Sequence, residues 1–546
     1  MKIKSKIGLF FISASLLLVT NCSSNKNPKQ IENKKNGGII NISLFDPVET
    51  FDPNKILYNS DWQVSMLLYE GLVGYKSSYY NLEPLIAESW EVKEDGSIYI
   101  FYLRDNVYFQ DSPCFANLQG RKVNADDVMF TFQRIADSKK PSVNFSLFCD
   151  KIIGMKDYQK GKAESIEGIK VIDSLTVEFK LTKPFTTFLN ILASSAAYII
   201  PHEAIEFFKE DFYKHPVGTG SFKISYWLPT EELFLIKNKN YWGKDSSGIQ
   251  LPYIDGISYK FLSDNSLDIT GFFNEKLDLI IVNKSKYRKI KQSSTNKKFT
   301  TIKTKPGLGI KFFAFSMDKK NPLTSYTKLR EAIAAAFDRS KIFDVKDSND
   351  NLMNSLVPQQ ILDLNAKEHS YDLSKAKKII SGLPDKVKSE IFSVCSSVKS
   401  RDSELLVKGM KDIGLKVKLD VHAKNYYRGI INERPDIFRV SMLPSFPDPT
   451  EYYALFYSKS GKDNNLAQYK NPKYDELFEA SLYEQNKEKR KDIFRKLEDI
   501  LFNDIPIIYV SHEPSKYVLL SEKVKNFKFR TIFPDFRYLW VENETH

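Results

Sequence analysis

Short strand-like segments alternate with helix-like segments along the chain from residue 37 onward, and no unit repeats. The strand-like stretches include 37–45 and 310–317, and the helix-like stretches include 60–75 and 325–343. Strands and helices that alternate over such a length are typical of α/β folds. At 546 residues the chain is too long for one hydrophobic core, so we expect two or more domains.

Several local signals define individual elements. The stretch 89–104 predicts a hairpin, because two alternating strands flank the turn sequence Glu-Asp-Gly at 94–96. Asn124 is a good N-cap for the acidic start of a helix over 124–137. Further on, 405–423 predicts a helix and a strand joined across Gly414.

The N-terminus has the pattern of an export signal. Lys2, Lys4 and Lys6 precede an apolar stretch over 7–19, which is too short to cross a bilayer of about 30 Å as a helix. The stretch stops at Leu-Val-Thr-Asn-Cys, which resembles a bacterial lipobox with Cys22 as the lipidated residue. The alternative is an ordinary signal with a chance cysteine nearby. A polar tether over 22–36 follows, as an anchored globular protein needs.

Composition excludes several classes of function. No later stretch has 18 consecutive apolar residues, so we expect no transmembrane helix. The formal charge is +12, and removing the three signal lysines leaves +9 on a chain whose acidic residues are interspersed nearly everywhere. This pattern favours a solvated lysine-rich surface over a nucleic-acid site. The six histidines and four cysteines show no metal-binding spacing, and no nucleophile motif stands out.

The cysteines leave one question open. Cys114 and Cys149 could form a disulfide in an oxidising envelope, or could both stay free, while Cys395 has no partner.

Nine segments in register resemble a known family, the extracytoplasmic solute-binding proteins of peptide-type ABC importers, called family 5. The similarity extends from about 37 to 530. The segments are FDPNKILYNSDWQVSMLLYEGLVGY, LEPLIAESWEVKEDGSIYIFYLRDNVYF, VNADDVMFTFQRIAD, VGTGSF, NKNYWG, LREAIAAAFDRSKI, SFPDPTEYYALF, NNLAQYKNPKYDEL and IPIIYV.

The resemblance implies a periplasmic-binding-protein-like type II fold of two α/β lobes joined by two crossovers, with an extra subdomain in the first lobe. The chain would then return to the first lobe through IPIIYV. The expected boundaries are 1–21 for the signal peptide, 22–36 for the tether, 37–80 and 196–304 for the first lobe, 81–195 for its subdomain, 305–504 for the second lobe and 505–546 for the return.

The resemblance also implies a function. Members of the peptide class enclose a short peptide by hinge closure and bind its main chain as an added strand. We therefore expect a monomeric lipoprotein of the bacterial envelope, on the periplasmic side or cell surface, that delivers oligopeptides to a permease and ATPase without cofactor or catalysis. The alternatives are a receptor for a non-peptide solute, or a surface lipoprotein for sensing or adhesion; a hydrolase is the least expected.

One family position departs from the pattern. The segment RVSMLPSFPDP has Ser445 where peptide-binding relatives have an aspartate that pairs with the ligand ammonium. A buried ammonium without a carboxylate is costly. Asp448 could compensate only in a reshaped loop, and its simpler interpretation is a turn residue between two prolines.

Other positions carry the expected ligand contacts over by resemblance. Arg439 could pair with the ligand carboxylate, or could bridge to an acidic residue of its own lobe. Asn464 matches the first asparagine of a family Asn-Asn loop. Tyr58 and Asn59 align with a segment whose main chain pairs with peptide, and Tyr509 lies in IPIIYV. We expect the glycines of VGTGSF and the aromatic residues of NKNYWG to be architectural.

Overall fold

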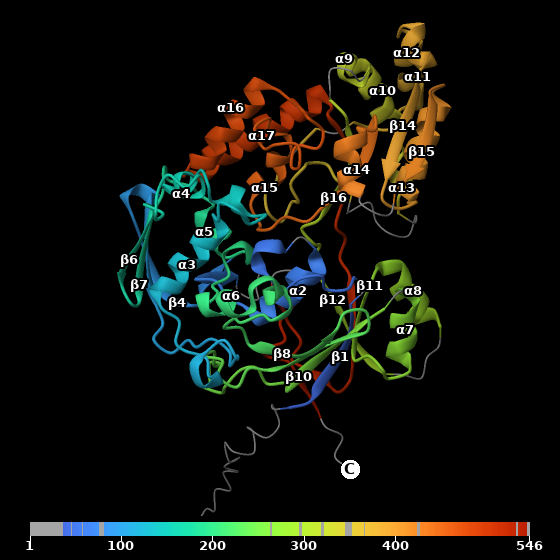
Figure 1. Ribbon diagram of the computed structural model, residues 1–546. Helices are drawn as coiled ribbons and strands as arrows, with labels where there is room; N and C mark the ends of the chain where they lie inside the picture. The colour runs from blue at the N-terminus through green and yellow to red at the C-terminus, as the bar shows by residue number, and fades with distance from the viewer. Residues whose placement is uncertain are drawn as a thin grey trace, which may run out of the picture.

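The computed structural model describes residues 37–542 except 45, 57, 76–80, 263–264, 294–297, 318–321, 344–351, 365, 368, 423–425 and 531–532. These residues form two α/β lobes, each built around its own sheet (Figure 1). The first lobe lies at the bottom and left of Figure 1, and the second lobe lies at the top. The predicted fold class is confirmed. None of the described helices is long and apolar enough to cross a membrane.

A seven-stranded mixed sheet forms the first lobe. Its first strand pairs in parallel with the strand at 256–261 and sends alternate residues, Ile40 and Ile42, into the largest hydrophobic core. In spatial order the strands are β12 (Phe299–Lys303), β18 (Tyr517–Ser521), β11 (Leu279–Val282), β1 (Ile39–Leu44), β10 (Gly256–Phe261), β9 (Glu232–Lys237) and β8 (Phe222–Leu228).

A smaller antiparallel sheet lies to one side of the first lobe. Its strands, in order, are β4 (Ala87–Lys93), β5 (Ile98–Leu103), β7 (Thr176–Lys180) and β6 (Ile169–Asp173). Helix α3 (Ala125–Ile135) packs against it, and the Asn124 side chain accepts from the Asp127 N–H while Asp127 accepts from the Asn124 N–H. The hairpin predicted at 89–104 and the capped helix predicted at 124 are both confirmed.

A five-stranded sheet forms the second lobe, with helices on both faces. Alternate residues of the central strand point to opposite sides, so that Phe313 and Phe315 pack on one helical layer and Phe312 and Ala314 on the other. The strands are β15 (Lys416–Val421), β14 (Ile391–Ser396), β16 (Ile437–Met442), β13 (Ile310–Phe315) and β17 (Ile507–His512). The first layer contains α10 (Thr327–Ala336), α11 (Leu373–Ser381) and α13 (Arg401–Asp412), and the second contains α14 (Tyr426–Glu433), α16 (Pro472–Tyr483) and α17 (Lys487–Asp504).

Two sequence predictions about this lobe are wrong. The helix expected over 325–343 ends at Ala336, because Phe337 leaves helical geometry with a ψ of 103° and packs edge-on against Phe313. The segment IPIIYV does not carry the chain back to the first lobe. It forms β17, which pairs with β13 in the second-lobe sheet.

Two short connectors join the lobes. The chain leaves the first lobe between β12 and β13, and it returns between β17 and β18, after residue 512 instead of at residue 505. The connectors lie side by side. The Thr304 N–H donates to the Lys516 carbonyl at 2.8 Å, and the Glu513 N–H donates to the Gly309 carbonyl at 2.7 Å.

A buried carboxylate holds several loops of the first lobe together. Glu70, which is 4% exposed, accepts hydrogen bonds from the Thr219 hydroxyl at 3.0 Å, the Tyr241 hydroxyl at 3.0 Å and the Trp242 indole N–H at 2.8 Å. We call this group the Glu70 anchor. It explains why the segments VGTGSF and NKNYWG occur together, because each supplies donors to the same carboxylate.

The glycines of VGTGSF have a packing role. A Cβ atom at Gly218 would lie 2.2 Å from the Leu68 carbonyl oxygen, and one at Gly220 would lie 2.3 Å from the Leu67 carbonyl oxygen. Only glycine allows the loop to approach α2 (Asn59–Leu68) so closely. These glycines are architectural, but as close-packing positions on α2 within the first lobe, not as the tight-turn positions between lobes that the sequence predicts.

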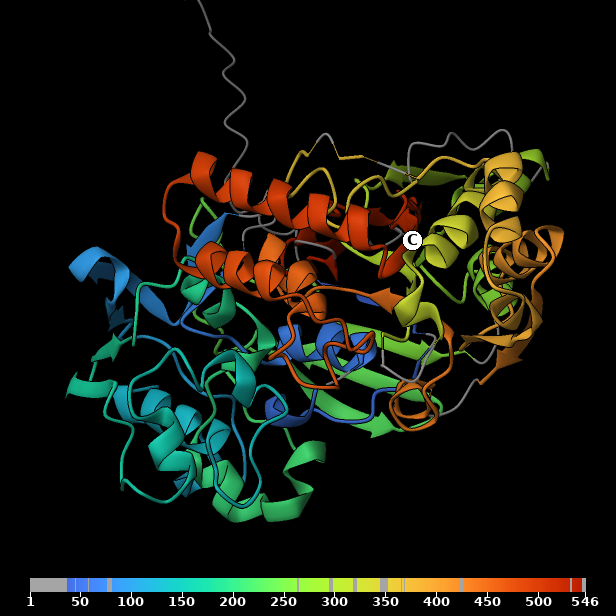
Figure 2. The ribbon, with the colours of Figure 1, turned by 90° about the horizontal axis from the view of Figure 1, so that it is seen from above.

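The two lobes touch along one side. Figure 2 shows α16 and α17 side by side over the first lobe, and the end of α16 reaches that lobe. The Thr186 N–H donates to the Leu482 carbonyl at 3.3 Å, and the Phe185 and Tyr483 rings lie 5.0 Å apart. Leu482 and Tyr483 also pack against the first-lobe core. The two lobes are therefore in direct contact.

Candidate functional site

A cavity lies between the two lobes. It is partly open to solvent. The first lobe contributes Trp62, Met66, Tyr69, Val73, Gly74, Tyr75, Leu85, Ala193, Tyr198 and Phe533, the second lobe contributes Pro444, Ser445, Phe446 and Pro447, and the connector contributes Leu308.

Helix α2 and a short strand build the first-lobe wall. The Trp62 ring packs edge-on against Phe533 with centroids 5.2 Å apart, and the Tyr69 and Tyr198 rings stack at 5.9 Å. Beyond them runs β2 (Val73–Tyr75), whose residues all line the cavity. In the described part of the chain β2 has β3 (Leu82–Pro84) as its one ladder partner.

The second-lobe wall is the segment 444–447, which follows β16. It is held in place by Asp448, which caps α15 (Pro449–Tyr453) by accepting from the Thr450 N–H at 2.9 Å. Arg490 also donates to both Asp448 carboxylate oxygens at 2.9 Å. The turn-residue interpretation of Asp448 therefore fits the structure, and its carboxylate is already fully engaged.

The lining is aromatic and aliphatic, and none of the lining residues carries a charged side chain. Next to this lining lies Glu451, whose carboxylate accepts from the Ser445 N–H at 3.0 Å. Burial raises the pKa of Glu451 to about 7, and nearby Asp448 adds to the rise. Burial, together with the charges of Asp448 and Glu451, also raises the pKa of Tyr75 well above its usual range. The cavity therefore has an apolar surface with one carboxylate at its wall.

Ser445 is the one predicted ligand contact that lines this cavity. Tyr58 and Asn59 are exposed at the start of α2, and Tyr58 is 54% exposed. Asn464 is exposed, whereas its neighbour Asn465 is buried and donates to the Tyr469 carbonyl at 2.8 Å.

Arg439 and Tyr509 lie inside the second lobe. Arg439 is buried and donates through Nε to Asp402 at 2.9 Å, which is the lobe-internal pairing left open by the sequence. The Tyr509 hydroxyl donates to Glu498 of α17. Neither residue lines the interlobe cavity.

The remaining sequence predictions concern cysteines. Cys114 and Cys149 are both free, so the structure has the unpaired alternative and the possible disulfide is not formed. The predicted lipidation site Cys22 lies outside the described residues.

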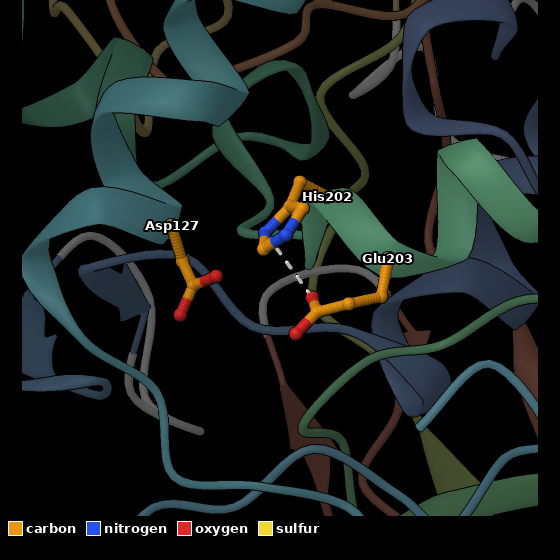
Figure 3. A group of neighbouring side chains, drawn as sticks. All are labelled: Asp127, His202 and Glu203. Carbon is orange, nitrogen blue, oxygen red and sulfur yellow. Dashed lines mark ion pairs between the residues drawn. The ribbon is translucent and has the colours of Figure 1, made fainter. Parts of the chain in front are cut away.

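Asp127, His202 and Glu203 lie close enough together to hold a metal ion (Figure 3). The Arg121 guanidinium, however, already pairs with both carboxylates. The guanidinium donates to both Asp127 oxygens at 2.8 and 2.7 Å and to both Glu203 oxygens at 2.6 and 2.8 Å. One guanidinium therefore pairs with both carboxylates, and the cluster is a structural ion-pair network rather than a metal centre.

Sequence reasoning missed most of the lining. Trp62, Met66 and Tyr69 occupy the apolar face of a helix, where the same spacing predicts core packing. Phe533 follows the predicted strands by more than twenty residues and has no motif around it. Such residues become recognisable as cavity residues only when both lobes are in place.

Comparisons with known proteins agree with this architecture. The sequence model of the family described as "Bacterial extracellular solute-binding proteins, family 5 Middle" matches residues 81–464. The chain is similar to heme-binding protein A of Haemophilus influenzae, at 26% identity over 96% of this chain and 97% of that protein. It is also similar to a dipeptide-binding protein of Pseudomonas aeruginosa, at 24% identity over 88% of this chain and 90% of that protein. The structure of a periplasmic binding protein, DppA of Helicobacter pylori in complex with the peptide STSA, superposes with a TM-score of 0.77 at 21% identity, covering 94% of this chain and 100% of that one.

Proposed function

This chain belongs to family 5 of the bacterial extracellular solute-binding proteins, and on that premise we propose that it binds short peptides between its lobes. We further propose that it delivers these peptides to an ABC permease and its ATPase. The observation that carries the proposal is the cavity itself, with walls from both lobes and the residues of β2 along one side. A peptide that lies along β2 could pair with its main chain, and such hydrogen bonds are common to every peptide sequence.

The route to the membrane is part of the proposal. The N-terminal pattern supports export and lipidation at Cys22, which would keep the receptor close to its transporter in the cell envelope. We take the two sheets as the cores of the lobes and 81–195 as a subdomain of the first lobe.

One observation favours a second candidate ligand. The lining has many aromatic residues and no charged side chain, which would also suit an apolar solute that is not a peptide. The relative named heme-binding protein A is consistent with that alternative.

Native mass spectrometry of the purified protein separates the two candidates. We expect a bound load of mixed masses, corresponding to peptides of a few residues, that disappears on denaturation. A single discrete mass that does not fragment as a peptide would contradict the peptide proposal and support the second candidate. Protein refolded without ligand should regain affinity for synthetic peptides by calorimetry.

A further inference from the structure

The cavity wall lacks a charge where the ligand end is expected. Ser445 lines the cavity and is neutral. Asp448 follows Ser445 in the chain, but its carboxylate already pairs with Arg490 and caps α15. A ligand ammonium that entered the cavity would therefore need a different carboxylate, because an unpaired buried charge is strongly unfavourable.

Glu451 is that carboxylate. Its Oε2 atom lies 3.0 Å from the Ser445 nitrogen, so the acid stands directly behind a residue of the cavity wall. Among the described residues, Glu451 has no ion-pair partner. Glu451 does not itself line the cavity, and its contacts there are the backbone N–H and the hydroxyl of Ser445, so the carboxylate keeps acceptor capacity for a cation.

The charged and titratable groups around Glu451 come from both lobes. Asp448 lies on its own segment, and Lys151 and Tyr75 face it from the first lobe. Lys151 is beyond ion-pair distance and has the Phe185 ring 5.2 Å from its Nζ. Burial lowers the pKa of Lys151, and burial raises that of Glu451 to about 7. A nearby cation would therefore stabilise the ionised form of the Glu451 carboxylate.

We propose that Glu451 is the specificity-determining residue that pairs with the positively charged amino end of a bound peptide, in place of an acid at position 445. The inference rests on the proposed peptide-binding function. A cation beside Glu451 would favour its ionised form, so binding below pH 7 would release a proton. Affinity for a free amino end would accordingly rise between pH 6 and about 7.5.

The test compares the full chain's affinity for the tetrapeptide Ala-Phe-Phe-Ala with that for its N-acetylated form, measured by calorimetry at pH 7.5. We expect the natural chain to prefer the free amino form by at least tenfold. Glu451→Gln should reduce that preference to less than about threefold, mainly by weakening the free form. Ser445→Asp in the Glu451→Gln background should restore it. Glu476→Gln, an exposed acid on α16, is the matched control and should change neither affinity.

The outcomes separate a failure of the role assigned to Glu451 from a failure of peptide binding itself. If Glu451→Gln weakens both peptides equally, Glu451 acts on lobe closure and the inference is wrong. An unchanged preference, or a natural chain that binds both forms equally, would also overturn it while leaving peptide binding intact. If the natural chain binds neither form, the proposed function fails at the same time. Circular dichroism of Glu451→Gln checks that the variant is folded.

Discussion

Glu70 is a buried carboxylate and Glu451 is a half-buried one, and their surroundings differ in kind. Glu70 lies in the first lobe and accepts from three side-chain donors supplied by Thr219, Tyr241 and Trp242. Glu451 lies at the junction of the lobes, and its hydrogen bonds come from one residue, through the backbone N–H and the hydroxyl of Ser445. The first carboxylate has no further need of a partner, whereas the second does.

The difference separates a structural acid from a binding acid. A fully hydrogen-bonded carboxylate fixes the loops that donate to it, and removing it leaves their donors buried without acceptors. An incompletely satisfied carboxylate contributes little to the fold and retains capacity for a ligand. Three measurements test whether this distinction holds.

The largest effect is expected at the Glu70 anchor. Glu70→Ala would leave two buried donors and the half-buried Trp242 indole without an acceptor, at about 1–3 kcal/mol each, so we expect a loss of about 4 kcal/mol in the free energy of unfolding. Urea unfolding followed by tryptophan fluorescence measures it. Glu206→Ala, at an exposed glutamate of the same lobe, should stay within about 0.5 kcal/mol. Equal losses in the two variants would remove the basis for calling Glu70 an anchor.

A smaller loss is expected when Asp448 loses its cation. Arg490→Gln would strand a buried carboxylate and cost about 3 kcal/mol in the same assay. Arg495→Gln, which breaks an exposed pair with Asp492 on the same helix, should change stability by less than about 0.5 kcal/mol. Tighter binding of free-amino peptides by Arg490→Gln would show that Asp448, rather than Glu451, is the available acid.

The smallest effect is a pH dependence carried by Glu451. Its pKa in the folded chain, about 7, is above the ordinary glutamate value, so its contribution to stability is fully present below that ordinary value and is lost as pH rises through 7. Between pH 5 and 8 we expect this one group to lower the ligand-free unfolding free energy by about 2 kcal/mol. Denaturant midpoints measured across that range should fall less for Glu451→Gln. Parallel profiles for the two proteins would mean that Glu451 ionises normally.

Local signals in the sequence predict the elements of the fold well. The cap at Asn124, the turn at 94–96 and the left-handed Gly414 each act through neighbours in the chain, and the structure has the expected element at each position. The end of α10 was missed because it depends on Phe337 packing against a distant strand.

The candidate site was harder to predict than the fold. The contacts expected from family resemblance at Arg439 and Tyr509 are taken by Asp402 and Glu498, which lie 37 and 11 residues away in the chain. No sequence pattern predicts the partners of these two side chains. Glu451 follows a proline and a capping aspartate, where an acid usually serves the first turn of a helix. Its position behind Ser445 depends on how the preceding loop folds back.

The paired connectors constrain how the molecule opens. Because 304–309 and 513–516 lie side by side and are hydrogen-bonded to each other, a movement of one lobe relative to the other would have to bend both connectors together. Such paired connectors would favour a swing about a single axis, which would return the segment 444–447 to the same place against β2 at every closure. If the chain is the receptor that we propose, each closure would then present the next ligand with the same binding surface.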